Sequence, residues 1–314
     1  MRLVTYATPG APPQPGIELP DGSVIRVARV LGERAPATVA RLLGAMPQVR
    51  ERLDEAVAAV VADPGRATSD GLRVAADAVR LLAPLGERVL VVCTGANYRS
   101  HLQEMGEEPP EKPAWFIKNP NSVIGPGEPI RLPAGHADQV DFEGELCVVF
   151  GRLCHDVAAA DANSYLAGYT VLNDVSARDA LPGVAAAETP EQGRWAWTEM
   201  LLGKQFPSFA PLGPAVVTAD EIDDPADLRL TTTVNGAVMQ EATTADLAVD
   251  VPTLVAQLSR YFAFQPGDVL STGTPAGVGV ARTPPVFLRP GDTVTVEVKG
   301  VGALINPVIR DSRP

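Results

Sequence analysis

The chain has 314 residues, enough for one large domain or for a small domain attached to a larger one. It is 46% hydrophobic, and its 30 Pro and 28 Gly favour many turns and short strands, which argues against an all-helical bundle. A net charge of −12 repels phosphate backbones and anionic lipid, so we expect no nucleic-acid or membrane partner.

The cysteines Cys93, Cys147 and Cys154 are odd in number and show no C-x-x-C spacing. They therefore predict reduced, buried thiols rather than a disulfide framework or a zinc site. The chain does not open with a basic segment followed by an apolar stretch, and no run approaches the roughly 18 apolar residues needed to span a bilayer. We expect a cytoplasmic protein.

Residues 1–85 indicate a small N-terminal α/β module. Residues 24–27 and 30–31 predict short strands around the turn at residues 21–22. Residues 49–62 place apolar side chains at helical spacing and end before an Asp-Pro-Gly turn, which predicts an amphipathic helix. Nothing in this module suggests chemistry.

The second predicted domain covers residues 86–314 and begins with the apolar β-branched run at residues 89–93, which predicts a buried strand. Few helices follow, the clearest being the amphipathic segment 251–264. The expected fold class is therefore α+β, built mainly of mixed or antiparallel sheet. Further strands are predicted at residues 145–150, 169–172, 230–234, 269–272 and 293–298.

An acidic pattern in the second domain is the strongest local signal for chemistry. If the segment is a strand, Asp141, Glu143 and Glu145 project from one face, because side chains alternate. By itself such a pattern is usually a solvated strand face. Here the same face continues with Cys147 and Val149, so carboxylate repulsion beside an apolar surface would be costly and a bound cation would relieve it.

Asp174 supplies a further carboxylate, in the Asn173-Asp174 pair at the end of the predicted strand 169–172. Oxygen ligands from Glu143, Glu145 and Asp174 suit Mg²⁺ or Mn²⁺, with Ca²⁺ as a substitute in a crystal, and leave positions open for a chelating substrate. Zinc would prefer His or Cys, and none lies at ligand spacing.

Several segments together resemble the fumarylacetoacetate hydrolase family. They are Asn97-Tyr98-Arg99-Ser100-His101 followed by Glu104, the acidic pattern, Gly168 to Asp179, and blocks within 204–214, 234–240, 266–279 and 300–306. The blocks follow the family's order over residues 90 to 310. The N-terminal module resembles the extension of many bacterial members, although that part is not diagnostic.

The resemblance implies a mixed β-sandwich roll, usually in a homodimer, that acts on a small anionic 2-oxo acid. It implies a metal held by Glu143, Glu145 and Asp174. His101 and Glu104 would form a catalytic pair on a lid over the substrate. Their i, i+3 spacing agrees, because neighbours on a helix allow the carboxylate to orient the imidazole.

The resemblance also assigns Lys204 a catalytic place near the substrate oxygens, and Tyr98, Arg178 and Thr274 a place in substrate binding. Alternatives remain at this stage. An unaccompanied histidine is usually a surface or satisfied core residue, as we expect for His136 and His155. Lys204 could only snorkel to the surface, and Arg178-Asp179 could be a structural ion pair.

The chain departs from the family pattern at Leu181, where many relatives have Gln, and at Pro207, where relatives often have an acid. Both changes put the substrate in doubt and leave the metal ligands intact. Residues 182–197 look like an inserted loop, whose Trp195 and Trp197 either pack or shape specificity.

These features favour hydrolysis of a carbon–carbon bond in a 2,4-dioxo acid, such as an acylpyruvate or fumarylpyruvate-like product of aromatic degradation. A metal-stabilised enolate would be the common intermediate. The same enolate would also serve a 2-oxo acid decarboxylase, isomerase or hydratase, and fold and metal site do not decide between these. A non-catalytic metal-binding scaffold is a further alternative, which turnover of any 2-oxo acid would remove.

Overall fold

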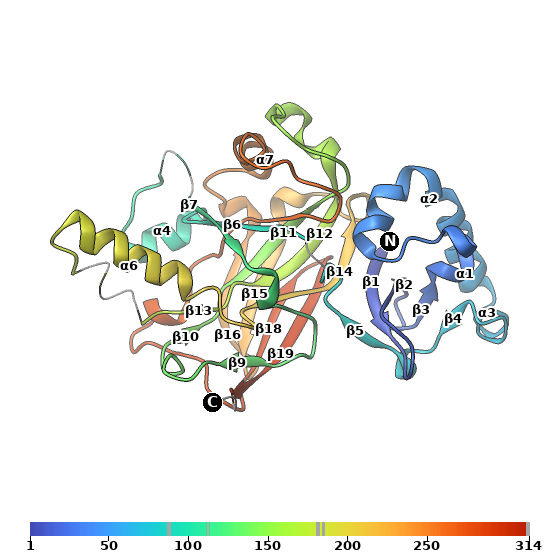
Figure 1. Cartoon of the computed structure of the whole chain (residues 1–314), viewed down its shortest axis with the longest axis horizontal. Helices are drawn as coiled ribbons and strands as arrows, with labels where there is room; N and C mark the ends of the chain where they lie inside the picture. The colour runs from blue at the N-terminus through green and yellow to red at the C-terminus, as the bar shows by residue number, and fades with distance from the viewer. Residues whose placement is uncertain (87–88, 111, 113, 180–182, 184–185, 312–314) are drawn as a thin grey trace.

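A computed structural model describes residues 1–86, 89–110, 112, 114–179, 183, 186–311 (Figure 1). The chain folds around one large sheet, and β5 (Arg80–Leu82) and β8 (Val123–Ile124) pair onto it at β1 and β14. From edge to edge the sheet contains β4 (Arg73–Val74), β3 (Val24–Arg26), β2 (Gln14–Glu18), β1 (Arg2–Ala7), β14 (Ala210–Thr218), β12 (Leu166–Asn173), β11 (Gly144–Phe150), β17 (Val269–Ser271), β6 (Val91–Gly95) and β7 (Ala114–Lys118).

A second sheet packs against the middle of the first, and apolar side chains from both form the main core, including Leu146, Val171, Leu230 and Val296. The strand order of this second sheet is β16 (Ala237–Thr243), β15 (Arg229–Val234), β18 (Thr293–Val298), β19 (Gly302–Arg310) and β9 (Ile130–Leu132). Strand β10 (Val140–Asp141) pairs separately with β13 (Ser176–Ala177). Most pairs are antiparallel, but β17–β6, β14–β8 and β19–β9 are parallel. The predicted α+β, mainly β fold is confirmed.

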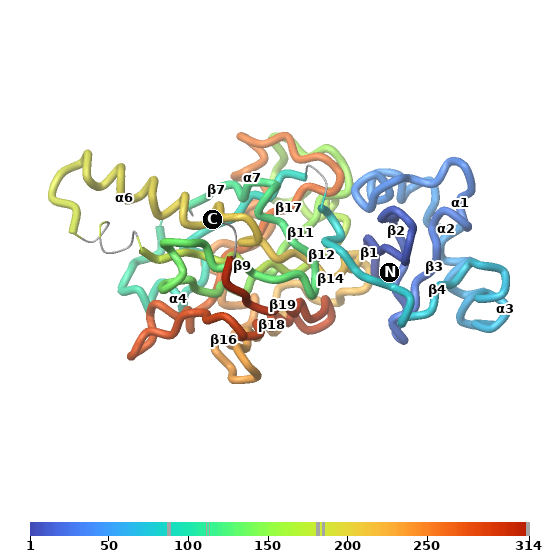
Figure 2. Tube along the Cα trace, turned by 60° about the horizontal axis from the view of Figure 1, so that its bottom comes forward, coloured from blue at the N-terminus to red at the C-terminus, as the bar shows by residue number. Residues whose placement is uncertain are grey.

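The helices gather at the two ends of the molecule. In Figures 1 and 2, α1, α2 and α3 lie with the N-terminal strands at one end, and α4 and α6 lie at the other. Figure 1 shows α7 beyond one end of the central strands. Their bounds are α1 (Val27–Leu31), α2 (Val39–Ala62), α3 (Pro64–Ser69), α4 (Arg99–Met105), α6 (Pro190–Leu202) and α7 (Val251–Leu258).

Three sequence-based predictions of local structure need correction. The strand expected at residues 30–31 is wrong, because these residues end helix α1, which buries Val27 and Leu31 one turn apart. The helix expected from residue 49 starts at Val39, after the Thr38 side chain accepts a hydrogen bond from the Arg41 amide. The helix expected over 251–264 ends at Leu258. The remaining predicted strands overlap observed ones.

The first 85 residues share both a sheet and a core with the rest of the chain. Strand β1 pairs antiparallel with β14, with Leu3 opposite Val216. One apolar cluster joins Leu42 of α2 to core residues of β11 and β17. Gly267, at φ 92°, lets Ala40 approach, since a Cβ there would lie 2.4 Å from the Ala40 Cβ. Unfolding of the module should therefore expose the larger sheet.

Two further expectations can be compared with the structure. The cysteines Cys93, Cys147 and Cys154 are buried and free. Within the described ranges, no helix has both the length and the apolar character needed to cross a membrane.

We expect Leu42→Ala to lower the free energy of unfolding by about 2 to 5 kcal/mol, because it removes a fully buried side chain. Val61→Ala, on the exposed side of the same helix, should change it by less than about 0.5 kcal/mol. All three tryptophans lie beyond residue 85, so their fluorescence during urea unfolding reports on the larger part of the chain. If Leu42→Ala does not change the urea concentration at which the tryptophan fluorescence changes, the N-terminal module unfolds independently of the rest of the chain.

Candidate active site

Three carboxylates meet where β11 begins and β12 ends. Glu143 and Glu145 flank the start of β11, and Asp174 directly follows β12. The antiparallel pairing puts Gly144 opposite Asn173, and the Asp174 amide donates to the Glu143 carbonyl at 2.8 Å. One oxygen from each of the three carboxylates lies within 4.8 Å of the others, and all three residues are buried. The predicted ligand set is therefore a compact cluster.

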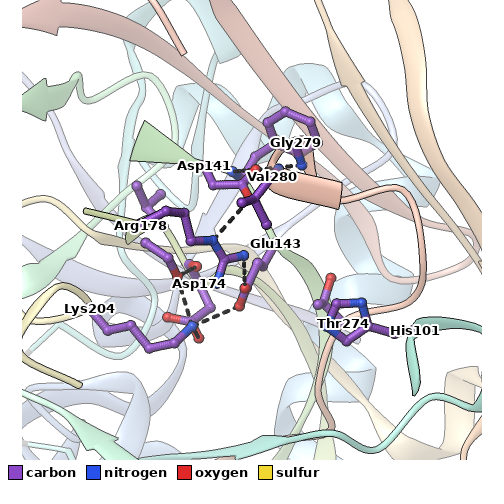
Figure 3. Close-up of polar contacts among 12 residues, drawn as sticks. His101, Asp141, Glu143, Asp174, Arg178, Lys204, Thr274, Gly279 and Val280 are labelled. Atoms are coloured by element: carbon purple, nitrogen blue, oxygen red, sulfur yellow. Dashed lines mark hydrogen bonds and ion pairs between the residues drawn. The ribbon is translucent and has the colours of Figure 1, made fainter. Parts of the chain in front are cut away.

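Two cations line the cluster, as Figure 3 shows. The Lys204 ammonium donates to Glu143 Oε2 at 2.8 Å, to Asp174 Oδ2 at 2.6 Å and to Ser176 Oγ at 2.7 Å. Arg178 donates through Nε to Asp141 Oδ2 at 3.0 Å, and its Nη2 donates to Glu143 Oε1. Lys204 is thus a buried partner of the carboxylates rather than a lysine that reaches the surface.

Lys118 is a third buried cation, which the sequence analysis missed. Its ammonium donates to Asp174 Oδ1 at 2.6 Å and to the Val175 carbonyl at 3.3 Å, and its side chain is fully buried. The available signal was a lysine at the end of the apolar run 114–117, directly before Asn-Pro. A charge in that position must find a partner if the strand is buried.

Asp141 has a supporting place beside the cluster. Its carboxylate accepts from the Gly279 amide at 2.7 Å and the Val280 amide at 3.1 Å, as well as from Arg178. Strand pairing is interrupted between β10, which ends at Asp141, and β11. Asp141 therefore positions Arg178, and Arg178 pairs with Asp141 and Glu143 rather than with its sequence neighbour Asp179.

The protonation of the cluster indicates what it can hold. Burial raises the pKa of Glu145 well above its ordinary value, and the carboxylates of Asp174 and Glu143 add to this rise. Burial also acts to raise the pKa of Glu143, but Lys204 and Arg178 outweigh it, and the pKa lies below its ordinary value. For Lys204, burial acts to lower the pKa, yet the Asp174 and Glu143 charges raise it. A divalent cation held by oxygen ligands would relieve the repulsion at Glu145, so the three carboxylates fit Mg²⁺ or Mn²⁺.

The His101–Glu104 pair faces the cluster from α4. His101 Nδ1 lies 3.2 Å from Glu104 Oε2, and Glu104 Oε1 accepts from the Gly277 amide at 2.9 Å. Because a carboxylate only accepts, this contact places the proton of a neutral imidazole on Nδ1 and leaves Nε2 with a lone pair. Asp246 fixes the start of the helix by accepting from the Ser100 amide at 3.0 Å. The expected helical neighbours are therefore in contact.

The two remaining predicted substrate contacts differ in position. Thr274 lines the cavity, but its hydroxyl already donates to the Gly144 carbonyl at 3.0 Å and accepts from Gln240 Nε2 at 2.8 Å. Gln240, which the sequence analysis did not single out, also accepts from the Gly144 amide at 2.9 Å and so joins the two segments. Tyr98 is completely buried and is not among the described residues that line the cavity.

The cavity has a volume of about 190 Å³, and its lining includes the carboxylate cluster, Arg178, Lys204, His101 and Thr274. The sequence predicts an inserted loop over residues 182–197. That expectation is wrong for residues 190–197, because they belong to helix α6, whose start is fixed by a capping box of Thr189 and Gln192. Leu181 lies outside the described residues, and Pro207 is exposed. The apolar lining residues include Leu102, Met105, Ala114, Phe116, Trp197, Met200 and Leu201.

The predictions for the other histidines can also be compared with the structure. His136 Nδ1 lies 3.5 Å from Asp179 Oδ2, and His155 Nδ1 lies 2.9 Å from the Ser259 carbonyl. Neither histidine lines the cavity within the described part of the chain.

Comparison with known proteins gives consistent results. Residues 90–309 match the family model for the C-terminal domain of fumarylacetoacetate hydrolase. The chain is 36% identical to the mitochondrial oxaloacetate tautomerase of Xenopus laevis over 98% of this chain and 90% of that protein.

Solved structures resemble the whole chain. A 5-carboxymethyl-2-hydroxymuconate delta-isomerase from Mycobacterium smegmatis has a TM-score of 0.71 at 34% identity, with full coverage of both chains (100% and 100%). Maleylpyruvate hydrolase from a Sphingobium strain, in complex with manganese(II) and pyruvate, has a TM-score of 0.76 at 27% identity, with 99% of each chain covered.

We expect Glu143→Gln, Glu145→Gln and Asp174→Asn each to abolish stabilisation by metal, because each removes a charged oxygen ligand. The unaltered protein should gain about 2.7 kcal/mol when free Mn²⁺ is a hundred times its dissociation constant. Thermal denaturation with and without Mn²⁺ measures the difference, and Glu241→Gln, at an exposed carboxylate, serves as the control. Undiminished stabilisation in all three variants would contradict this ligand set.

Lys118→Met should lower the free energy of unfolding by about 3 to 5 kcal/mol, since it removes one of the two buried cations that contact Asp174 and leaves Asp174 Oδ1 without its charged partner. Arg66→Met breaks an exposed ion pair with Asp70 and should cost at most about 1 kcal/mol. Urea unfolding in the presence of a chelator compares the two variants. Equal stabilities would mean that Asp174 does not depend on Lys118.

Proposed function

The chain belongs to the fumarylacetoacetate hydrolase family, and on that premise we propose that it is a divalent-metal-dependent hydrolase of acylpyruvate-like 2,4-dioxo acids. The observation that carries the proposal is that His101 and the carboxylate cluster line one cavity. A base and an oxygen ligand set for a cation are the two elements that this hydrolysis requires.

The charged residues of the cavity suit a 2-oxo acid. A cation held by Glu143, Glu145 and Asp174 would bind the substrate carboxylate and polarise the neighbouring 2-oxo group. Lys204 and Arg178 lie beside Glu143 in the same cavity and would offset negative charge that develops on the substrate oxygens. The proposed ligand is therefore a small anionic 2-oxo acid.

His101 supplies the proton transfers. Its Nε2 removes a proton from water, and the water oxygen bonds to the 4-carbonyl carbon of the substrate. The bond between carbons 3 and 4 then breaks, its electron pair passes to the enolate of the pyruvate portion, and the acyl portion leaves as a carboxylic acid. The protonated imidazole returns a proton to carbon 3. Glu104 holds the ring in the orientation that these steps need.

A second candidate is proton transfer without attack by water, as in a tautomerase or isomerase. Two of the similar proteins carry such names, the oxaloacetate tautomerase and the delta-isomerase. The same base can move a proton between carbon and oxygen of an enol, so the geometry of His101 is compatible with both reactions. Decarboxylation and hydration remain further variants of the same enolate chemistry.

The remaining parts of the proposal rest on relatives and on the sequence. Manganese and pyruvate in the similar maleylpyruvate hydrolase support Mn²⁺ or Mg²⁺ as cofactor and a 2-oxo acid as ligand. A homodimer, a cytoplasmic location and a place in aromatic degradation remain predictions.

The test is a screen of the metal-supplemented protein against acylpyruvates, oxaloacetate and dienoates, with product identification by mass spectrometry. Release of pyruvate and a carboxylic acid from an acylpyruvate supports hydrolysis. Isomerised products alone would support the second candidate, a tautomerase or isomerase. If no compound is turned over, a binding protein without catalysis would be favoured.

We expect His101→Ala to reduce acylpyruvate hydrolysis by about 10² to 10⁴, the usual contribution of a general base, with metal binding unchanged. Glu104→Gln should have a smaller effect in the same direction, because it keeps the contact with the ring but loses the charge that orients it. Steady-state rates and calorimetric titration with Mn²⁺ measure the two properties. The matched control is His155→Ala, whose ring lies outside the cavity. A loss of only a fewfold in His101→Ala would remove it as the base.

A further inference from the structure

The cavity lining combines charged and apolar side chains. The charged groups of the candidate chemistry are those described above. The apolar walls come from three separate elements: Ala114 and Phe116 of β7, Trp197, Met200 and Leu201 of α6, and Leu102 and Met105 of α4. They adjoin the charged groups, because the Lys204 ammonium nitrogen lies 5.0 Å from the centroid of the Phe116 ring. A substrate bound through its 2-oxo acid group would place its remaining atoms against these walls.

The cations of the cavity are already engaged by carboxylates and a hydroxyl. Arg178 is shared by Asp141 and Glu143, and the three ammonium protons of Lys204 go to Glu143, Asp174 and Ser176. Among the described residues lining the apolar walls, none carries a positive charge. Among the described lining residues, the one charged side chain that is not part of the candidate chemistry is an acid, Glu107.

A second carboxylate on the substrate would therefore lack a partner. Placing a charge against apolar side chains without compensation is strongly unfavourable, and a nearby carboxylate adds repulsion. An uncharged alkyl or aryl group would instead remove apolar surface from water on both partners. This favours a substrate with a single carboxylate.

Helix α6 presents its side chains unequally to the cavity. Trp197 lines it and remains 45% exposed, so a ligand can cover part of the ring. Met200, one turn further, lines it as well. Trp195 lies on the same helix but lines a separate hollow. The helix therefore offers both a test position and a matched control.

We propose that the acyl portion of the substrate is uncharged and apolar, and that Trp197 and Met200 select for it. The inference rests on the proposed function for the position of the 2-oxo acid group. It separates this chain from enzymes for dicarboxylic 2-oxo acids, including oxaloacetate, although the carboxylate cluster would bind the shared part of both substrates.

Binding provides the first test and needs no turnover. 2-Oxohexanoate and 2-oxoadipate have chains of equal length and differ at the far end, where one has a methyl group and the other a carboxylate. In calorimetric titrations of the Mn²⁺-supplemented protein, 2-oxohexanoate should bind at least about tenfold more tightly, the lower limit for discrimination by such pockets. Equal or tighter binding of 2-oxoadipate would overturn the inference.

Variants identify the selecting residues. Trp197→Ala should weaken binding of 2-oxohexanoate severalfold and leave 2-oxoadipate nearly unchanged, and Met200→Lys should reverse the preference by supplying a cation. Trp195→Ala should leave both affinities unchanged. Equal losses for both ligands in Trp197→Ala, or no gain for 2-oxoadipate in Met200→Lys, would show that α6 does not select the acyl portion.

Turnover separates this inference from the proposed function. The matching pair is 2,4-dioxohexanoate and 2,4-dioxoadipate, and the ratio of their kcat/KM values should follow the binding preference. If neither is cleaved while 2-oxohexanoate still binds more tightly, the hydrolase proposal fails and the inference stands. If 2,4-dioxoadipate is cleaved at a higher kcat/KM, the inference fails and the hydrolase proposal stands.

Discussion

Four carboxylates buried at the start of β11 and the end of β12 require charge compensation, and the surrounding structure supplies it. Asp141, Glu143, Glu145 and Asp174 are each at most 5% exposed. Three cations reach them from separate parts of the chain: Lys118 from the end of β7, Arg178 from beyond β13, and Lys204 from beyond α6. Each contact ties another segment to the centre of the sheet. With all four carboxylates ionised, one negative charge would remain in excess, at a set of oxygen ligands suited to a divalent cation.

Hydrogen bonds from neighbouring segments fix the position of helix α4. Glu104 of α4 accepts from the Gly277 amide, and Asp246 accepts from the Ser100 amide at the beginning of the helix. Gln240 of the second sheet holds the Thr274 hydroxyl and the Gly144 amide together. Helix α4 is thus tied both to the loop after β17 and to Asp246, and these contacts hold His101 at the cavity. If His101 is the base, as proposed, it would lose little conformational freedom when a substrate binds.

The sequence pointed to those parts of the site that have a local pattern. Strand alternation and a strand end suggested Glu143, Glu145 and Asp174 as neighbouring carboxylates. The family resemblance singled out His101 with Glu104, and their helical spacing agreed with it. Lys118 was missed because its burial depends on β7 joining the sheet beside β6, a non-local pairing. The prediction of a strand at residues 30–31 failed for a related reason, since two β-branched or aliphatic residues in a row carry no periodicity. The local sequence indicates where a strand forms, whereas the partner of a buried charge depends on which strands pair with one another.

This division between local and non-local features bears on how one fold serves different reactions. The carboxylates lie at or beside the start of β11 and the end of β12, and they are held by buried cations, so substituting one member of a pair leaves a buried charge without that partner. The apolar walls belong to α4, α6 and β7, where Trp197 and Met105 are substantially exposed. We expect substitutions at these exposed positions to cost little in folding. Under the proposed function, the chemistry at the 2-oxo acid group would be constrained by electrostatics, while the choice of substrate would vary with the side chains of these walls.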